Sequence, residues 1–219
     1  MNKIFMLPIV IVMILSCNNN TENTSGNVDT SMHQSHHNAT ADTTTENGMN
    51  AIKQTMDKMM HEMHASKSTG NNDIDFATMM LTHHKGAVEM SKVEINQGSN
   101  AELKTFAQKV IDDQNKEIAF MEEFISKAPK SVSANATDFQ KALSSSMMAM
   151  MNDTRADYNN IDKDFAAQMI PHHQSAVDMA QAYLKYGQEA SLQTLCKNIL
   201  DSQSKEIHWL KEWLIKNAN

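Results

Sequence analysis

The chain has 219 residues, of which 41% are hydrophobic and 21% charged, enough for one sizeable core or two small ones. Aromatic residues make up only 5%, with six Gly and three Pro, which disfavours a β-sandwich or β-barrel. The formal charge of −7 argues against a nucleic-acid binder, because no general basic surface is available for phosphate contacts. The two cysteines cannot form a disulfide scaffold or a Cys₄ metal site.

The composition departs most from that of ordinary globular proteins in its nineteen Met and ten His. Thioether and imidazole groups are both metal ligands. The excess is therefore the first indication of function.

Residues 1–16 are predicted to be a signal peptide of the lipoprotein type. Lys3 gives the positive start, and the apolar run over 4–15 is too short to span a bilayer. Cleavage before Cys17 would leave a thiol for lipidation; a secretory peptide that leaves Cys17 incidental is the alternative. We therefore expect an exported, membrane-anchored lipoprotein that faces the periplasm.

Residues 17–50 are rich in Asn, Thr, Ser and Asp and nearly free of large apolar side chains. Such a segment cannot offset the entropy cost of ordering, so a disordered tether is expected. It contains His33, His36 and His37, which we interpret as an accessory metal-capturing arm, although polar linkers also tolerate histidine.

From residue 51 the pattern becomes helical and repeats at an offset of 89 without a gap. The matching positions include Asp75/Asp164, Met80/Met169, His83-His84/His172-His173, Met90/Met179, Gly98/Gly187 and Gln114/Gln203. We expect one bundle over 51–219, with repeat A over 51–130 and repeat B over 137–219.

Each repeat is predicted to contain two long helices, over 73–97 and 100–127 and over 162–186 and 189–216, preceded by short helices near 51–65 and 138–152. Gly98 and Gly187 are expected to be left-handed helix stops. A capping box is expected at Ser99 with Glu102 for the helix over 100–127, and Thr137 with Gln140 is expected to cap the second short helix. The fold class is all-α, an antiparallel four-helix bundle of two hairpins.

The candidate metal ligands fall on one third of the circumference of the first long helix in each repeat, at about 100° per residue. They are Met80, His83, His84, Met90, Met169, His172, His173 and Met179. This face should point into the bundle. The alternative is that the histidines are core residues satisfied by Gln114 or Glu117 and that the methionines fill core space.

Pro171 replaces Thr82 of the first repeat one position before His172. An interior Pro breaks or kinks a helix at a cost of about 3 kcal/mol, and such a breach is more expected at a functional site. The alternative is that the helix starts at Pro171, with 163–169 forming a separate turn.

Imidazole and thioether ligands favour soft Cu(I), or Ag(I), over zinc, calcium or a di-iron centre, which prefer thiolate or carboxylate ligands. His61 and His64 are further accessory candidates. The methionine stripes Met56, Met59, Met60, Met63 and Met147, Met150, Met151 are interpreted mainly as core. Cys196 lies on an apolar stripe and should be buried and inert, and no catalytic constellation is recognised.

The stretch MIPHHQSAVDMA over 169–180, followed by Gln203, Glu206 and Ile207, resembles the domain of unknown function 305 family. The resemblance covers roughly 73–217, and the first repeat departs from it at Thr82 and Lys85. It implies a ferritin-like bundle and kinship with CopM-type periplasmic copper-binding proteins. It also implies His83, His84, Met90, His172, His173 and Met179 as ligands.

Three functions follow as hypotheses. The first is a copper-binding lipoprotein that holds Cu(I), with Cu(II) as a further ion for the His-rich arm. It would serve resistance, storage or delivery to an unknown partner. The second is a metal-dependent oxidoreductase of the bundle type. The third is a metal-free interaction module. We expect the first, and not an enzyme.

Overall fold

The computed structural model describes residues 51–151 and 157–218, and all regular structure in these residues is α-helical. The predicted all-α class is confirmed. The predicted signal peptide and tether lie outside the described residues, as do Cys17 and His33, His36 and His37. The helices are α1 Ala51–Ala65, α2 Asn72–Gln97, α3 Ala101–Lys127, α4 Ala136–Ser146, α5 Met148–Met151, α6 Ile161–Tyr186 and α7 Ala190–Lys216.

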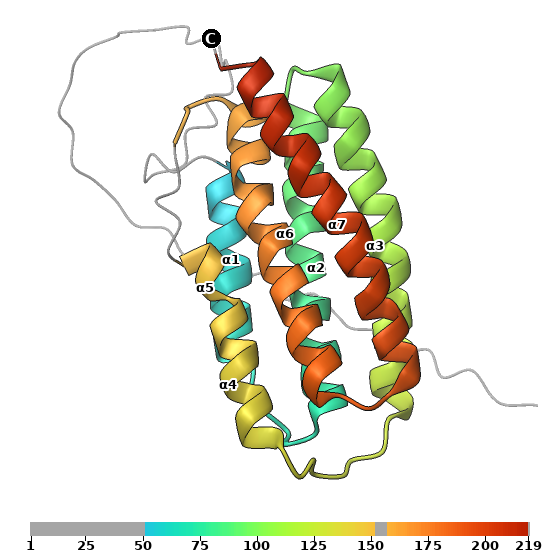
Figure 1. Cartoon of the computed structure of the whole chain (residues 1–219). Coiled ribbons are helices and arrows are strands. Elements are labelled where there is room, and N and C mark those ends of the chain that lie inside the picture. Colours follow the sequence, from blue (N-terminus) through green and yellow to red (C-terminus); the bar gives the residue numbers. More distant parts are fainter. Residues whose placement is uncertain (1–50, 152–156, 219) are drawn as a thin grey trace, which may run out of the picture. The chain divides into compact units, whose positions relative to one another are not determined.

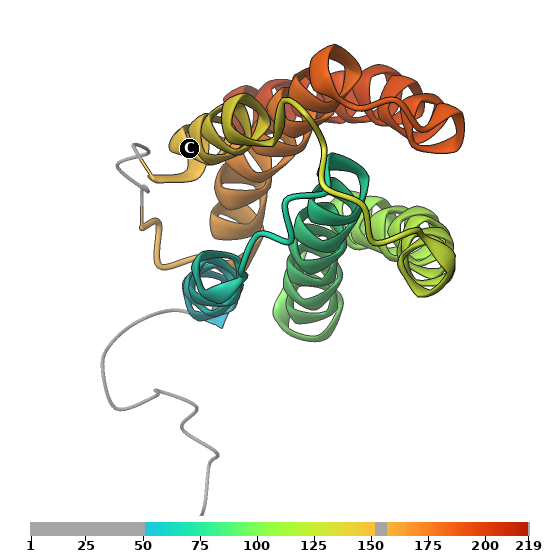
Figure 2. The same ribbon diagram turned by 90° about the horizontal axis from the view of Figure 1, so that it is seen from below.

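Two long hairpins, α2–α3 and α6–α7, form the centre of the fold (Figure 1). Helices α2 and α6 pack against each other in opposite directions. The side chain of Asn72 at the start of α2 donates to the carbonyl of Tyr186 at the end of α6, and Asp162 at the start of α6 accepts from the Ser99 and Asn100 backbone beyond the end of α2. Figure 2 shows α2 and α6 side by side with α3 and α7 flanking them; α1 packs on α2 and α6, and α4 mainly on α6.

The apolar core is unusually rich in methionine. The buried methionines are Met56, Met59, Met60, Met63, Met80, Met90, Met121, Met147, Met150, Met169 and Met179. The flexible thioether side chain fills irregular space well, so the core interpretation of most of the α1 and α4–α5 stripes fits their placement. Met151 differs, because its side chain is 52% exposed.

The prediction of left-handed stops at Gly98 and Gly187 is wrong. Gly98 has φ −66° and ψ 162°, and Gly187 has φ −84° and ψ 156°, so both are extended. Space explains the glycines instead. A Cβ on Gly98 would overlap the Glu94 carboxyl group, and a Cβ on Gly187 would overlap the Tyr183 ring.

The predicted caps are also wrong. Asn100, not Ser99, caps α3 by accepting from the amides of Glu102 and Leu103, because Ser99 is engaged by Asp162. Helix α4 starts at Ala136, so Thr137 lies inside it, and Gln140 donates to Asp75 on α2. The second short helix is also interrupted at Met147, which gives α4 and α5.

Helix α6 continues through Pro171 from Ile161 to Tyr186. The alternative of a new helix beginning at Pro171 is therefore wrong. Pro171 is buried and lies one residue before His172, at the centre of the fold.

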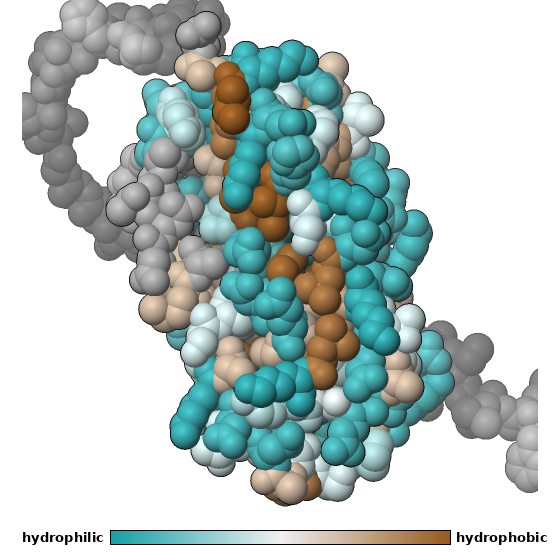
Figure 3. All heavy atoms as spheres, in the orientation of Figure 1, coloured by the Kyte–Doolittle hydropathy of each residue, from teal (hydrophilic) through white to brown (hydrophobic). Residues whose placement is uncertain are grey.

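The surface seen in Figure 3 is mostly hydrophilic, with an apolar band over α6 and α7. Among the residues that the structure describes, no helix has both the length and the apolar character needed to cross a membrane.

Candidate metal centre

Four histidines meet where α2 and α6 cross. His83, His84, His172 and His173 are all fully buried, with no exposed surface. The rings of His83 and His172 lie close together and tilted, with centroids 3.7 Å apart and an angle of 32° between their planes. Because the helices are antiparallel and the pairs sit near their midpoints, each His pair lies opposite its counterpart in the other repeat.

Three of these rings have an acceptor at Nε2. His84 Nε2 lies 2.7 Å from Glu117 Oε2 on α3, and His172 Nε2 lies 3.0 Å from the carbonyl oxygen of His83. His173 Nε2 lies 3.2 Å from Glu206 Oε2 on α7, close enough for an ion pair but outside good hydrogen-bond geometry. The alternative to metal binding, in which Glu117 satisfies a core histidine, is therefore confirmed for His84.

The remaining ring nitrogens have no hydrogen-bond partner within the described part of the chain. They are Nδ1 of all four histidines and Nε2 of His83 and His173. A buried polar group left unsatisfied costs about 1–3 kcal/mol, and native proteins contain few of them. These unpartnered nitrogens in the core are therefore candidate ligand atoms, because each neutral ring has one lone pair that a metal ion could accept.

The electrostatics of the cluster favour neutral rings. Burial lowers the pKa of His83, and the neighbouring His172, His84 and His173 lower it further. Burial also lowers the pKa of His172, with His173 contributing in the same direction. Metal ions bind the neutral imidazole, so these two rings are held in the form that binds metal without prior loss of a proton.

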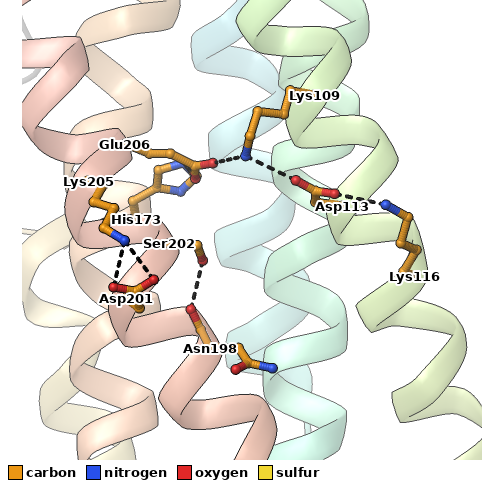
Figure 4. A network of polar contacts seen from close by, with 9 residues as sticks. All are labelled: Lys109, Asp113, Lys116, His173, Asn198, Asp201, Ser202, Lys205 and Glu206. Atoms are coloured by element: carbon orange, nitrogen blue, oxygen red, sulfur yellow. Dashed lines mark hydrogen bonds and ion pairs between the residues drawn. The ribbon is translucent and has the colours of Figure 1, made fainter.

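Glu206 connects the cluster to the surface (Figure 4). Its carboxylate lies 2.8 Å from Lys109 Nζ on α3, and Lys109 also pairs with Asp113 at 3.0 Å. Burial by itself would raise the pKa of Glu206, but His173 and Lys109 outweigh that effect and lower it. Glu206 is therefore an anion that His173 and Lys109 share.

The predicted thioether ligands lie on the same two helices. Met80, Met90, Met169 and Met179 are fully buried in the apolar core. Met80 precedes His84 by four residues and Met169 precedes His173 by four, a spacing that places side chains next to each other on a helix. Among the described residues, no group of three or more His, Cys, Asp or Glu side chains is arranged to hold a metal ion.

The accessory metal-ligand candidates on α1 differ from the buried histidine cluster in their exposure to solvent. His61 and His64 are exposed, and His64 Nδ1 lies 2.7 Å from the carbonyl oxygen of Met60.

Cys196 is fully buried, and burial raises the pKa of its thiol to about 12. The thiolate that would react or bind metal is thus strongly disfavoured.

A contact with the histidines was proposed from the sequence only for Gln114 and Glu117, although Gln203 and Glu206 were named as well. Gln203 is buried on α7, one turn before Glu206, as Gln114 is on α3 before Glu117, and the Oε1 atoms of both glutamines lack a partner among the described residues. Lys109 was missed altogether. The available signal was the Gln-x-x-Glu spacing, which recurs at the same offset of 89 as the histidines.

Comparison with known proteins places this geometry in a family. The sequence model described as Domain of unknown function (DUF305) matches residues 17–125 and 73–214. The chain belongs to the DUF305 family. No match was found among curated proteins.

Solved structures share the fold of this chain. CopM in the Cu(I)-bound form is 32% identical, with a TM-score of 0.52, over 67% of this chain and 98% of CopM. CopM in the Ag-bound form is 30% identical, with a TM-score of 0.50, over 66% and 95%. A DUF305 protein from Streptomyces coelicolor, 21% identical over 69% of this chain and 96% of its own, has a TM-score of 0.55 and shares the fold alone.

Proposed function

We propose that this DUF305 protein binds copper, as Cu(I), through the histidine pairs and the neighbouring methionines at the crossing of α2 and α6. The observation that carries the proposal is the set of buried ring nitrogens without a hydrogen-bond partner among the described residues. The metal would supply an electron-pair acceptor for those of these nitrogens that carry a lone pair.

The donor types decide the metal. Imidazole and thioether groups are soft or borderline ligands, which favour Cu(I) and Ag(I) over the hard cations that prefer oxygen. The thioethers need no deprotonation, and His83 and His172 are held neutral by burial and by their neighbours. The candidate ligands are Met80, His83, His84, Met90, Met169, His172, His173 and Met179.

The relatives support the choice of ion. CopM has been solved in Cu(I)-bound and Ag-bound forms, and it is 30–32% identical to this chain over about two thirds of it. Two different soft ions in one relative agree with a site selected by ligand softness.

The apolar run over 4–15 followed by Cys17 supports an exported, lipid-anchored protein that would hold copper for resistance, storage or delivery. We propose a binding protein and not an enzyme. His33, His36 and His37 of the arm, with His61 and His64, would add weaker metal capacity.

The proposal is tested by anaerobic titration with Cu(I) against a competing chelator. The chain from residue 17 onward is used, with Cys17→Ser and with His33, His36 and His37 replaced by Ala, so that only sites in the helical region are counted. We expect at least one tightly held ion per chain. The double variant His172→Gln/His173→Gln should lose it, and His61→Gln/His64→Gln, which changes exposed rings, should keep it.

Unchanged stoichiometry in the His172/His173 variant would refute the assignment. Failure of the parent chain to compete with the chelator would return the histidines and methionines to a purely structural role.

A further inference from the structure

The hydrogen-bond partners at the histidine cluster determine which nitrogen of each ring is available. Glu117 is a carboxylate and the His83 carbonyl is a backbone oxygen, and both can only accept. The nitrogens that face them, Nε2 of His84 at 2.7 Å and Nε2 of His172 at 3.0 Å, must therefore carry the hydrogen. A neutral ring has one N–H and one lone pair, so the lone pair of each of these rings lies on Nδ1.

In His84 and His172, Nδ1 is also the ring nitrogen without a hydrogen-bond partner among the described residues, whereas His173 lacks one at both nitrogens although its Nε2 faces Glu206. Nδ1 of His84, His172 and His173 each lacks a hydrogen bond within the described residues, and all three rings are fully buried. A histidine that binds a metal usually donates its other N–H to a carboxylate or a backbone carbonyl, which fixes the tautomer and the orientation of the ring. Two rings have that arrangement here, with Nε2 as the donor.

The carboxylate contact of His173 in the second repeat is longer than the equivalent contact of His84 in the first repeat. His173 Nε2 faces Glu206 at 3.2 Å, against 2.7 Å for His84 and Glu117. Glu206 is also bound by Lys109 at 2.8 Å, so its negative charge is divided between a cation and the ring (Figure 4). The carboxylate should orient His173 less strongly than Glu117 orients His84.

We infer that Nδ1 is the metal-binding atom of His84 and His172, where Glu117 and the His83 carbonyl are positioning groups that fix this choice, and that Glu206 favours Nδ1 of His173 in the same way but more weakly. The inference rests on the proposed function for the metal, but its tautomer part is testable without any metal. Glu117 and Glu206 touch a ligand and not the ion, so they act through the rings.

The test is nitrogen NMR of the chain from residue 17 onward with Cys17→Ser, carrying ¹⁵N-labelled histidine, before and after addition of Ag(I), which is diamagnetic. Single His→Gln variants assign the rings. Without metal, we expect His84 and His172 to be Nε2–H tautomers. With Ag(I), the Nδ1 resonances of these rings and of His173 should shift, while Nε2 keeps its proton.

The outcomes separate the two proposals. Coordination of Ag(I) through Nε2, or an Nδ1–H tautomer in the metal-free chain, overturns the inference and leaves copper binding in place. Absence of any Ag(I) effect on these four rings overturns both. Nε2–H tautomers together with Nδ1 shifts support both.

Variants of Glu117 test the positioning role. Glu117→Leu removes the acceptor, so the Nε2–H tautomer of His84 should lose its preference and Ag(I) affinity should fall at least tenfold, in the range of about 10–100-fold seen for such partners. Glu117→Gln keeps a carbonyl acceptor and should restore both the tautomer and most of the affinity. Glu122→Leu is the control on the same helix, because Glu122 is exposed and pairs with Lys85, away from the histidine rings.

A Glu117→Leu chain that keeps the wild-type tautomer and affinity would contradict the role. Should that variant fail to fold, the metal-free wild-type chain still decides, because its tautomer is measured without any substitution at Glu117. An Nδ1–H signal for His84 in that chain would overturn the inference.

Discussion

Two equivalent aspartates hold the crossing of α2 and α6 at the level of single residues. Asp73 at the start of α2 accepts from the hydroxyl of Tyr183, near the end of α6. Asp162, its counterpart 89 residues later, accepts from Ser99 and Asn100 and faces Glu94, which occupies the position equivalent to Tyr183. At one end of the crossing, therefore, a tyrosine hydroxyl donates to an aspartate, and at the other end two carboxyl groups face each other.

Glu94 should make stability depend on pH. Burial raises its pKa to about 8 from an ordinary 4.5, with the nearby Asp162 carboxylate acting in the same direction. The folded chain thus keeps a proton that the unfolded chain loses, so this contribution is complete below about pH 4.5 and is lost as pH rises to about 8.

We expect Glu94→Gln to gain stability relative to wild type across that window, by about 1–3 kcal/mol in the free energy of unfolding. The Gln side chain keeps a hydrogen-bond donor for Asp162 and does not ionise. Urea unfolding at several pH values between 4.5 and 8 measures the difference. The exposed Glu89→Gln on the same helix is the control, and a difference that stays constant with pH would contradict the expectation.

Gly86 is a second residue where a single Cβ should matter. It is buried on α2, and a Cβ there would overlap the thioether of Met59 on α1 and lie 3.0 Å from the Met59 Cβ. Gly86→Ala should therefore destabilise by about 1–2 kcal/mol, because crowding outweighs the roughly 1 kcal/mol gained in helix propensity.

The equivalent position in α6 is Ser175, fully buried with a hydroxyl that lacks a hydrogen bond in the described part of the chain. Ser175→Ala removes that unsatisfied group and should be neutral or stabilising. Thermal unfolding of the two variants is the comparison. Equal effects at both sites would argue against the close approach of Met59.

At the scale of elements, the sequence predicted the long helices to within one residue at each end, because their apolar spacing is long and regular. The ends of the helices were predicted less well. Ser99 is a good cap by type, but Asp162 from α6 takes it, and Asn100 replaces it. Gly98 and Gly187 are needed for space against Glu94 and Tyr183 and not for a left-handed turn. Such contacts join residues far apart in sequence, which local patterns cannot show.

Pro171 is an irregularity inside α6 whose cost in folding stability can be measured. It has no N–H to donate within α6, and its ring crowds the preceding turn. Pro171→Ala should therefore raise the free energy of unfolding by about 1–3 kcal/mol. Thr82→Ala at the equivalent place in α2 should change it by less than about 0.5 kcal/mol. Urea unfolding checks both; a loss of stability in Pro171→Ala would mean that packing of the buried ring outweighs the helix defect.

At the scale of the whole molecule, the sequence placed the candidate ligands on inward faces, and the structure buries all eight. It could not show that the two His pairs meet, or that the ring centroids of His83 and His172 lie 3.7 Å apart, because the crossing of α2 and α6 joins residues 89 apart. The choice of nitrogen was equally out of reach, since it depends on acceptors from α3, α7 and the opposing backbone.

Binding at the crossing should stabilise the entire bundle, because the ligands come from both hairpins and a metal would join them. An ion that binds only the folded chain adds about 2.7 kcal/mol at one hundred times its Kd. For a chain of this size that corresponds to a rise in Tm of roughly 5–10 °C. Ag(I) is suitable for the measurement, because it is soft and does not change oxidation state during heating.

We therefore expect Ag(I) to raise the Tm of the wild-type chain and of the exposed-site variant His61→Gln/His64→Gln equally. The variant His172→Gln/His173→Gln removes ligands from one hairpin only, yet it should lose most of the rise, since the remaining pair on α2 cannot join the hairpins alone. A full rise in that variant would mean that each hairpin binds metal independently, and the crossing would then have no part in the site.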